Sequence, residues 1–122
     1  MTRLAIIGGS SFTQFSALSD ARRVTVDTPY GAPSGPLVLG RLAQREVVFL
    51  ARHGEQHHLP PHQINYRANL WALREQGASE VVAIATVGGI GAAFAPGVVA
   101  APDQLIDYTW GRISTYFEAD AG

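Results

Sequence analysis

Three apolar runs in this chain each end in a turn rich in glycine or carrying an Arg-His pair, and this feature constrains the fold most. The runs are "LAIIGGSS" from Leu4, "VVFLARHG" from Val47 and "VVAIATVGG" from Val81. Each is short, almost entirely apolar and bounded by turn residues, which predicts a buried β-strand. The sequence therefore predicts a sheet whose central strands are covered on both faces.

A helix separates the second run from the third. The pattern becomes helical at Gln63, two prolines precede it, and Gly77 occupies the position of a C-terminal cap. The apolar stripe of this helix consists of Ile64, Ala68, Leu70, Trp71 and Leu73. We expect Trp71 to lie in the core, and Asn65 and Asn69 to cap and brace the helix. A strand, helix, strand order predicts a βαβ unit with parallel strands.

Further strands are expected at Val24–Thr28, Leu37–Leu42 and Glu46–Ala51, with a turn-rich loop between the first two. Strands so close in sequence must form hairpins, so the predicted fold is α/β with a mixed central sheet. Val81–Pro102 has no charged residue over 22 positions and reaches the ~20 residues of a membrane helix. Its four glycines and two prolines instead favour a strand, a glycine-rich turn and a second strand.

Composition removes several classes of function. The 122 residues suit a single domain, and the net charge of −1 gives no electrostatic reason to expect nucleic acid or a membrane as partner. Cysteine is absent, which excludes disulfides and thiolate chemistry. All nine basic residues are arginine, so a lysine Schiff base and a P-loop lysine are excluded too. No signal peptide is evident after Met1, and we expect a cytoplasmic protein.

Ligands of such sheets bind at the carboxyl ends of the parallel strands, which selects Gly8–Ser11, Arg52-His53 and Ala85–Gly89. Arg52 offers a planar fork of donors that matches two oxygens of a phosphate, and His53 can donate a further hydrogen bond. The two glycine turns offer backbone N–H groups, with Ser10 Oγ as an extra donor. Together these groups predict a phosphate site. Taken singly, each glycine pair could be only a tight turn and Arg52 only a solvated charge.

Two other interpretations of the histidines stay open. His53 and His57, like His58 and His62, have the spacing of metal ligands on a helix, but Gly54 and two prolines make a helix there improbable. "ARHG" also resembles the strand-end Arg-His-Gly of the histidine phosphatases, in which the histidine accepts the phosphoryl group. In that family the motif follows the first strand, whereas at least three strands are expected before it here.

Four segments of the chain together resemble a known family: "AIIGGSSF", "VDTPYGAPSGPLVLGRL", "VVFLARHGEQHHLPPHQINYRANLWALREQGASEVVAIATVGGI" and "LIDYT". In this order they closely resemble the 5′-methylthioadenosine phosphorylases of the purine nucleoside phosphorylase superfamily, and most closely the bacterial methylthioinosine phosphorylases. The resemblance implies a three-layer fold with helices flanking the mixed sheet. It implies a pentosyltransferase that releases a purine base from a methylthio nucleoside by phosphorolysis, without cofactor or metal, in a homotrimer.

The resemblance places the phosphate contacts on Ser10, Arg52, His53, Ala85 and Thr86. Ser11 stands where the family commonly has glycine, and strain is expected if its φ is positive. Ala85 replaces a threonine or asparagine of many relatives, so a side-chain contact is lost there.

Family members are about twice as long, so residues 1–122 are expected to be the amino-terminal part of one phosphorylase domain, which ends at "STYFEADAG" before the sheet is closed. The other half of the family's domain carries the methionine against the ribose and the aspartate that binds the base. The alternative is a non-catalytic module that binds an anion or nucleotide.

Overall fold

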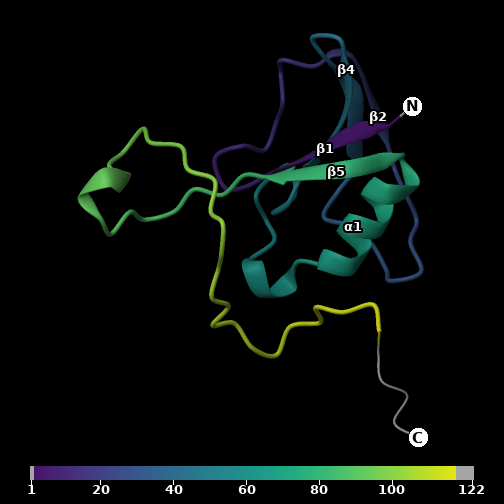
Figure 1. Ribbon diagram of the computed structural model, residues 1–122. Helices are drawn as coiled ribbons and strands as arrows, with labels where there is room; N and C mark the ends of the chain where they lie inside the picture. The colour runs from purple at the N-terminus through teal and green to yellow at the C-terminus, as the bar shows by residue number, and fades with distance from the viewer. Residues whose placement is uncertain (1, 118–122) are drawn as a thin grey trace, which may run out of the picture.

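A mixed five-stranded sheet forms the centre of the computed structural model, which describes residues 2–117 (Figure 1). The strands lie in the order β2-β3-β4-β1-β5. Their bounds are β1 Arg3–Gly8, β2 Ser19–Val24, β3 Leu37–Leu42, β4 Arg45–Ala51 and β5 Ala78–Ala83. β1 pairs in parallel with both β4 and β5, while β2, β3 and β4 are antiparallel neighbours. The predicted mixed sheet is confirmed.

The helix that links β4 to β5 is α1, Tyr66–Glu75, preceded by the short 3-10 helix η1, Pro61–Gln63. Asn65 caps α1, because its side-chain oxygen accepts the Ala68 N–H at 3.1 Å. Gly77 ends the helix with φ +82°, and its N–H donates to the Arg74 carbonyl at 2.9 Å. Both predicted caps are therefore present, and β4, α1 and β5 form the expected crossover.

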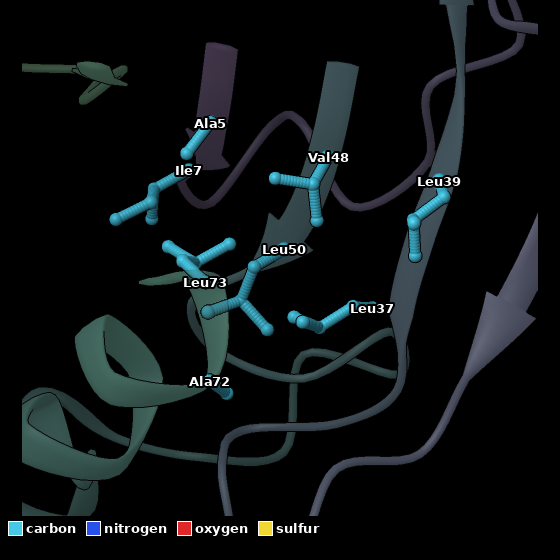
Figure 2. Packing of buried hydrophobic residues seen from close by; sticks show 8 residues of the cluster. All are labelled: Ala5, Ile7, Leu37, Leu39, Val48, Leu50, Ala72 and Leu73. Carbon is cyan, nitrogen blue, oxygen red and sulfur yellow. The ribbon is translucent and has the colours of Figure 1, made fainter. Parts of the chain in front are cut away.

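The main core lies between the sheet and α1 (Figure 2). It consists of Ala5 and Ile7 from β1, Leu37 and Leu39 from β3, Val48 and Leu50 from β4, and Ala72 and Leu73 from α1. The strand members alternate along each strand because successive side chains point to opposite faces of the sheet. Leu70, predicted to share this stripe, is 44% exposed and Trp71 is only partly buried, so the stripe of α1 is narrower than expected.

The opposite face of the sheet is covered by a loop instead of a helix. Ile6, Val47 and Phe49 point to this face, and the phenylalanines of the loop after β1 pack against them. The rings of Phe12 and Phe49 meet edge to face with centroids 5.2 Å apart. Within residues 2–117 the prediction of helices flanking the sheet thus holds for one face only, and the phosphorylase-type fold is partial.

One predicted strand has the wrong bounds. The alternation at Val24–Thr28 predicted a strand there, but β2 is Ser19–Val24 and its last residue pairs with Leu37. β2 is an edge strand with exposed polar side chains, so its pairing leaves no apolar alternation in the sequence. The alternation instead marks packing, since Val24 and Val26 lie against the main core.

After β5 the chain forms no further strand up to residue 117. The second strand predicted within Val81–Pro102 is not formed, and the regular structure there is the 3-10 helix η2, Ala92–Phe94. Figure 1 shows this green to yellow segment leaving the sheet beyond β5. Ser114–Phe117 carry no helix or strand, and the rest of the "STYFEADAG" segment lies outside the described residues. Across residues 2–117, no helix has the length and apolar character needed to cross a membrane.

Candidate anion-binding site

The three segments selected from the sequence meet at the carboxyl ends of β4, β1 and β5. The N–H of Arg52 donates to the Gly8 carbonyl at 3.0 Å, which ties the end of β4 to the end of β1. On the other side of β1, the N–H of Ile84 donates to the Ile7 carbonyl at 2.8 Å. The parallel order of these strands therefore brings the first glycine turn, Arg52 and the residues after β5 to one edge of the sheet.

Gly9 allows these segments to approach each other closely. A Cβ atom at this position would lie 2.7 Å from the Ile84 carbonyl oxygen and 2.8 Å from Nη2 of Arg52. Both distances are too short for a real contact, so any other residue would push the segments apart. The sequence suggested only that Gly9 belongs to a turn. The tandem glycines after a strand were the available signal, but they do not reveal what approaches them.

Arg52 lies beside this glycine with most of its donors free. Nη1 donates to the Ile84 carbonyl at a long 3.4 Å, and no acidic side chain among residues 2–117 forms an ion pair with it. The neighbouring Glu55 instead pairs with Arg23. Because guanidinium carries five N–H donors, Arg52 keeps enough of them to bind two oxygens of an anion.

His53 is held in a defined orientation. Its side chain is buried, at 6% exposed, and Nδ1 lies 2.8 Å from the Leu59 carbonyl oxygen, while the N–H of Leu59 donates to the His53 carbonyl at 3.0 Å. A carbonyl only accepts, so this contact assigns the hydrogen to Nδ1. Nε2 is then an acceptor in the neutral ring, and His53 donates to an anion there only as imidazolium. Nothing in the sequence indicated this role of Leu59.

The remaining predicted residues, Ser10, Ala85 and Thr86, are exposed. Ser10 is exposed, in a turn closed by the Phe12 N–H donating to the Gly9 carbonyl at 3.0 Å. The conditional strain at Ser11 does not arise, since its φ is not positive. Ala85 and Thr86 follow β5 and are exposed, and Ala85 Cα lies 3.5 Å from the Cβ position built at Gly9.

The geometry gives little support to the metal and phosphatase interpretations of the histidines. The rings of His53 and His57 lie 4.8 Å apart, but no group of three or more potential metal ligands gathers within residues 2–117. The Arg-His-Gly motif follows β4, the fourth strand of the chain, and so does not occupy the place it has in the histidine phosphatases, after the first strand.

The two hollows found in the described part of the chain lie away from the strand ends. A hollow of about 300 Å³ lies elsewhere, between the start of α1 and Gly111–Ile113, and is lined by Tyr30, His62 and Arg112 among others. A second, of about 210 Å³, lies at β2 and β3. Neither includes Arg52 or His53.

These features define a class: an α/β protein with candidate hydrogen-bond donors for an anion at the carboxyl ends of three parallel strands. Residues 3–121 match the Phosphorylase superfamily. The chain belongs to this superfamily.

The relatives are named as phosphorylases of methylthio nucleosides. A probable S-methyl-5′-thioinosine phosphorylase of Xanthomonas campestris is 58% identical over 115 residues, covering 94% of this chain and 46% of the relative. The S-methyl-5′-thioadenosine phosphorylase of Mycolicibacterium smegmatis is 50% identical over 95% of this chain and 44% of its own length. A solved methylthioadenosine phosphorylase of Schistosoma mansoni in complex with adenine superposes with a TM-score of 0.92 and 36% identity, covering 99% of this chain and 44% of that one. The chain spans about half the length of the curated relatives it matches.

Proposed function

We propose that residues 1–122 form the amino-terminal part of a single nucleoside phosphorylase domain. The enzyme splits a 5′-methylthio purine nucleoside, methylthioinosine or methylthioadenosine, with inorganic phosphate, giving the free base and 5-methylthioribose 1-phosphate. The observation that carries the proposal is the Arg52 guanidinium, which has no acidic partner within residues 2–117 and lies against Gly9 and Ile84 at the strand ends. The names of the relatives supply the substrate class.

The proposed site residues are Ser10, Arg52, His53, Ala85 and Thr86. A phosphate oxygen forms a bond to the anomeric carbon of the ribose while the bond from that carbon to the base breaks, and the electron pair leaves with the base. The sugar becomes cationic as this bond lengthens, so the task of the site is to hold the phosphate anion beneath it in line with the leaving base. Arg52 binds two phosphate oxygens, and backbone N–H groups of the glycine turns bind others.

His53 takes part in holding the proton of the phosphate. With Nδ1 donating to the Leu59 carbonyl, neutral His53 accepts a hydrogen bond from a protonated phosphate oxygen, and imidazolium donates one to an unprotonated oxygen. The proposal further includes a cytoplasmic location and a homotrimeric assembly, both from the family resemblance alone. No cofactor or metal enters the proposed reaction.

The direct test is phosphate-dependent release of the base from methylthioinosine, methylthioadenosine and inosine. The 122-residue chain is compared with the same chain extended by the part of the Xanthomonas campestris relative that it does not match. We expect release by the extended chain, and the preferred nucleoside identifies the base. An extended chain that folds but releases no base from any of the three would refute the proposed reaction. Binding of phosphate without turnover would then favour the anion-binding module.

Arg52→Ala tests the site itself. Loss of a charge-assisted, bidentate hydrogen-bond contact should weaken phosphate binding by about 1.5–3 kcal/mol, which is roughly 10-fold to 150-fold in the dissociation constant. The measurement is the phosphate dissociation constant of the extended chain by calorimetry. Arg112→Ala is the matched control, because Arg112 donates to Tyr66 Oη beside the hollow at α1, away from the strand ends. Equal phosphate affinity in the Arg52 variant and the control would remove Arg52 from the site.

A further inference from the structure

A second histidine lies directly beside His53, to which the proposed reaction gives a contact with phosphate. The ring centroids of His53 and His57 are 4.8 Å apart, and the two ring planes are inclined at 35° to each other. His57 is exposed, whereas His53 is 6% exposed. The buried His53 ring is therefore packed against an imidazole that borders solvent and has no task in the proposed reaction.

The loop after β4 folds back so that His57 returns to His53. The Gly54 N–H donates to the Ala51 carbonyl and the His57 N–H donates to the Gly54 carbonyl, both at 3.0 Å. The Leu59 N–H closes the loop by donating to the His53 carbonyl, also at 3.0 Å. His57 has φ +53°, in the left-handed region that residues with a Cβ atom rarely adopt. The conformation that brings this ring to His53 therefore has a local energetic cost, which points to a use for the contact.

The Leu59 carbonyl fixes one edge of the His53 ring but leaves its tilt less restrained. This carbonyl oxygen lies 2.8 Å from Nδ1. The χ2 torsion of histidine has a broad energy minimum, so a hydrogen bond at Nδ1 alone allows the ring plane to turn. The lone pair of Nε2 lies in the ring plane, so a turn of the plane changes the direction in which Nε2 points.

The ring of His57 restrains this tilt. Aromatic rings in contact prefer defined offsets and inclinations at centroid distances of about 4.5–7 Å, and the His53–His57 pair lies in this range. A turn of the His53 plane would drive an edge of its ring into the His57 ring. Leu59 thus acts on the position of Nδ1, and His57 acts on the tilt of the plane.

We propose that His57 is a positioning residue for His53: its ring holds the His53 imidazole at the tilt at which Nε2 faces the bound phosphate. The inference rests on the proposed role of His53 in holding the phosphate. His57 acts through packing and transfers no proton. Another aromatic ring at this position can therefore do the same task, whereas a side chain without a ring cannot.

The experiment uses three variants of the extended chain described above. His57→Asn removes the ring and suits the backbone, because asparagine tolerates positive φ. His57→Phe restores a ring without imidazole nitrogens. His62→Asn is the matched control, since it makes the same change at an exposed histidine of η1 that lines the hollow at α1.

Two measurements compare the variants with the unmodified extended chain. NMR follows the Nδ1–H proton of His53, which exchanges slowly with water only while it is held against the Leu59 carbonyl. Calorimetry gives the dissociation constant of inorganic phosphate. In His57→Asn we expect exchange to be faster and phosphate binding to be weaker, each by about 3-fold to 10-fold, the size of one aromatic contact. Both values should return in His57→Phe and stay unchanged in His62→Asn.

Unchanged Nδ1–H exchange in His57→Asn, or faster exchange with unchanged phosphate affinity, would overturn the proposal. A folded His57→Phe variant that behaves like His57→Asn would also overturn it, because the ring contact is then not what matters. Circular dichroism shows whether each variant is folded. If His57→Phe is not, a nuclear Overhauser contact between the ring protons of His53 and His57 in the unmodified chain decides, and its absence overturns the proposal.

Failure of the proposed function gives a different result. An unmodified extended chain that folds but binds no phosphate contradicts the proposed function. Faster Nδ1–H exchange in His57→Asn, restored in His57→Phe, would still support the positioning of His53 by His57, since this measurement needs no phosphate.

Discussion

Two regions of this chain are both rich in apolar residues, but only one of them forms a packed core. The packed region, Arg3–Ala83, contains every strand and the α-helix of residues 2–117, and side chains such as Leu50 are fully buried there. The open region, residues 84–117, contains one 3-10 helix, and Ile90 and Val99 are almost fully exposed. The uncharged stretch Val81–Pro102 belongs mostly to the open region. Hydropathy alone therefore does not bury a segment, because a surface must exist for it to pack against.

The end of the open region is tied to the packed region at the start of α1. Tyr116 Oη donates to the Arg67 carbonyl at 2.7 Å, and its ring meets that of Tyr30 with centroids 5.0 Å apart. The pKa of the Tyr116 phenol is raised above its usual value, mainly by burial and to a smaller extent by the nearby Tyr30. The open region is thus attached at both ends, by β5 and by Tyr116, with uncovered apolar residues between them.

Leu50→Ala should produce the largest difference between the regions. Leu50 is fully buried in the main core, and its truncation should lower the free energy of unfolding by about 2–5 kcal/mol. Leu105→Ala, the same change at a side chain 73% exposed, should alter it by less than about 0.5 kcal/mol. Urea unfolding of the 122-residue chain, followed by circular dichroism, measures both. Equal losses would mean that the open region packs in solution.

Asn69→Ala should have the next largest effect. Asn69 is 3% exposed, accepts the Ser34 N–H at 2.8 Å and donates to Ser34 Oγ at 3.0 Å, so it braces α1 against the loop before β3. Its removal leaves a buried N–H without a partner, which should cost about 1–3 kcal/mol of unfolding free energy.

The control for this variant is Gln104→Ala in the open region. Gln104 Oε1 accepts the Leu105 N–H at 3.0 Å, but both groups are exposed and water replaces the lost bond, so the expected change is below about 0.5 kcal/mol. The same urea titration compares the two. A loss at Gln104 as large as that at Asn69 would contradict the division into a packed and an open region.

The sequence predicted the central strands and α1 because their signals are local. β4 is buried on both faces, so Val47–Ala51 must be apolar throughout, and α1 carries its own caps at Asn65 and Gly77. β2 was misplaced because an exposed edge strand needs no apolar pattern. The strand predicted after the glycine-rich turn is not formed, since a strand exists only with a partner and residues 2–117 supply none.

The site was predictable to the same extent. The predicted parallel order of the strands correctly placed the first glycine turn, Arg52 and the residues after β5 at one edge, and their binding of an anion stays a prediction. The close approach at Gly9 and the Leu59 carbonyl that orients His53 were missed. Both involve backbone atoms from distant segments, and a backbone carbonyl is present at every residue, so no residue type marks it.

The smallest expected effect tests whether the open region keeps local structure without cover. Asp107 accepts a hydrogen bond from the Thr109 hydroxyl at 2.7 Å and another from the Thr109 N–H at 2.8 Å. Both hydrogen bonds lower the pKa of the Asp107 carboxyl below its usual value, and the bond from the hydroxyl has the larger effect. A lowered carboxyl pKa favours the folded turn above the pKa of the unfolded chain, and this contribution is lost as the pH falls through the folded pKa.

Thr109→Val removes the hydroxyl, so the pKa of Asp107 should rise toward its usual value while urea stability stays unchanged. Titration of the Asp107 carboxyl by NMR in the 122-residue chain measures this, with Thr115→Val as the control at a hydroxyl that Asp107 does not contact. An Asp107 pKa that is the same in both variants would show that the turn is absent in solution. The open region would then lack even local order until another surface covers it, which would widen its difference from the packed region.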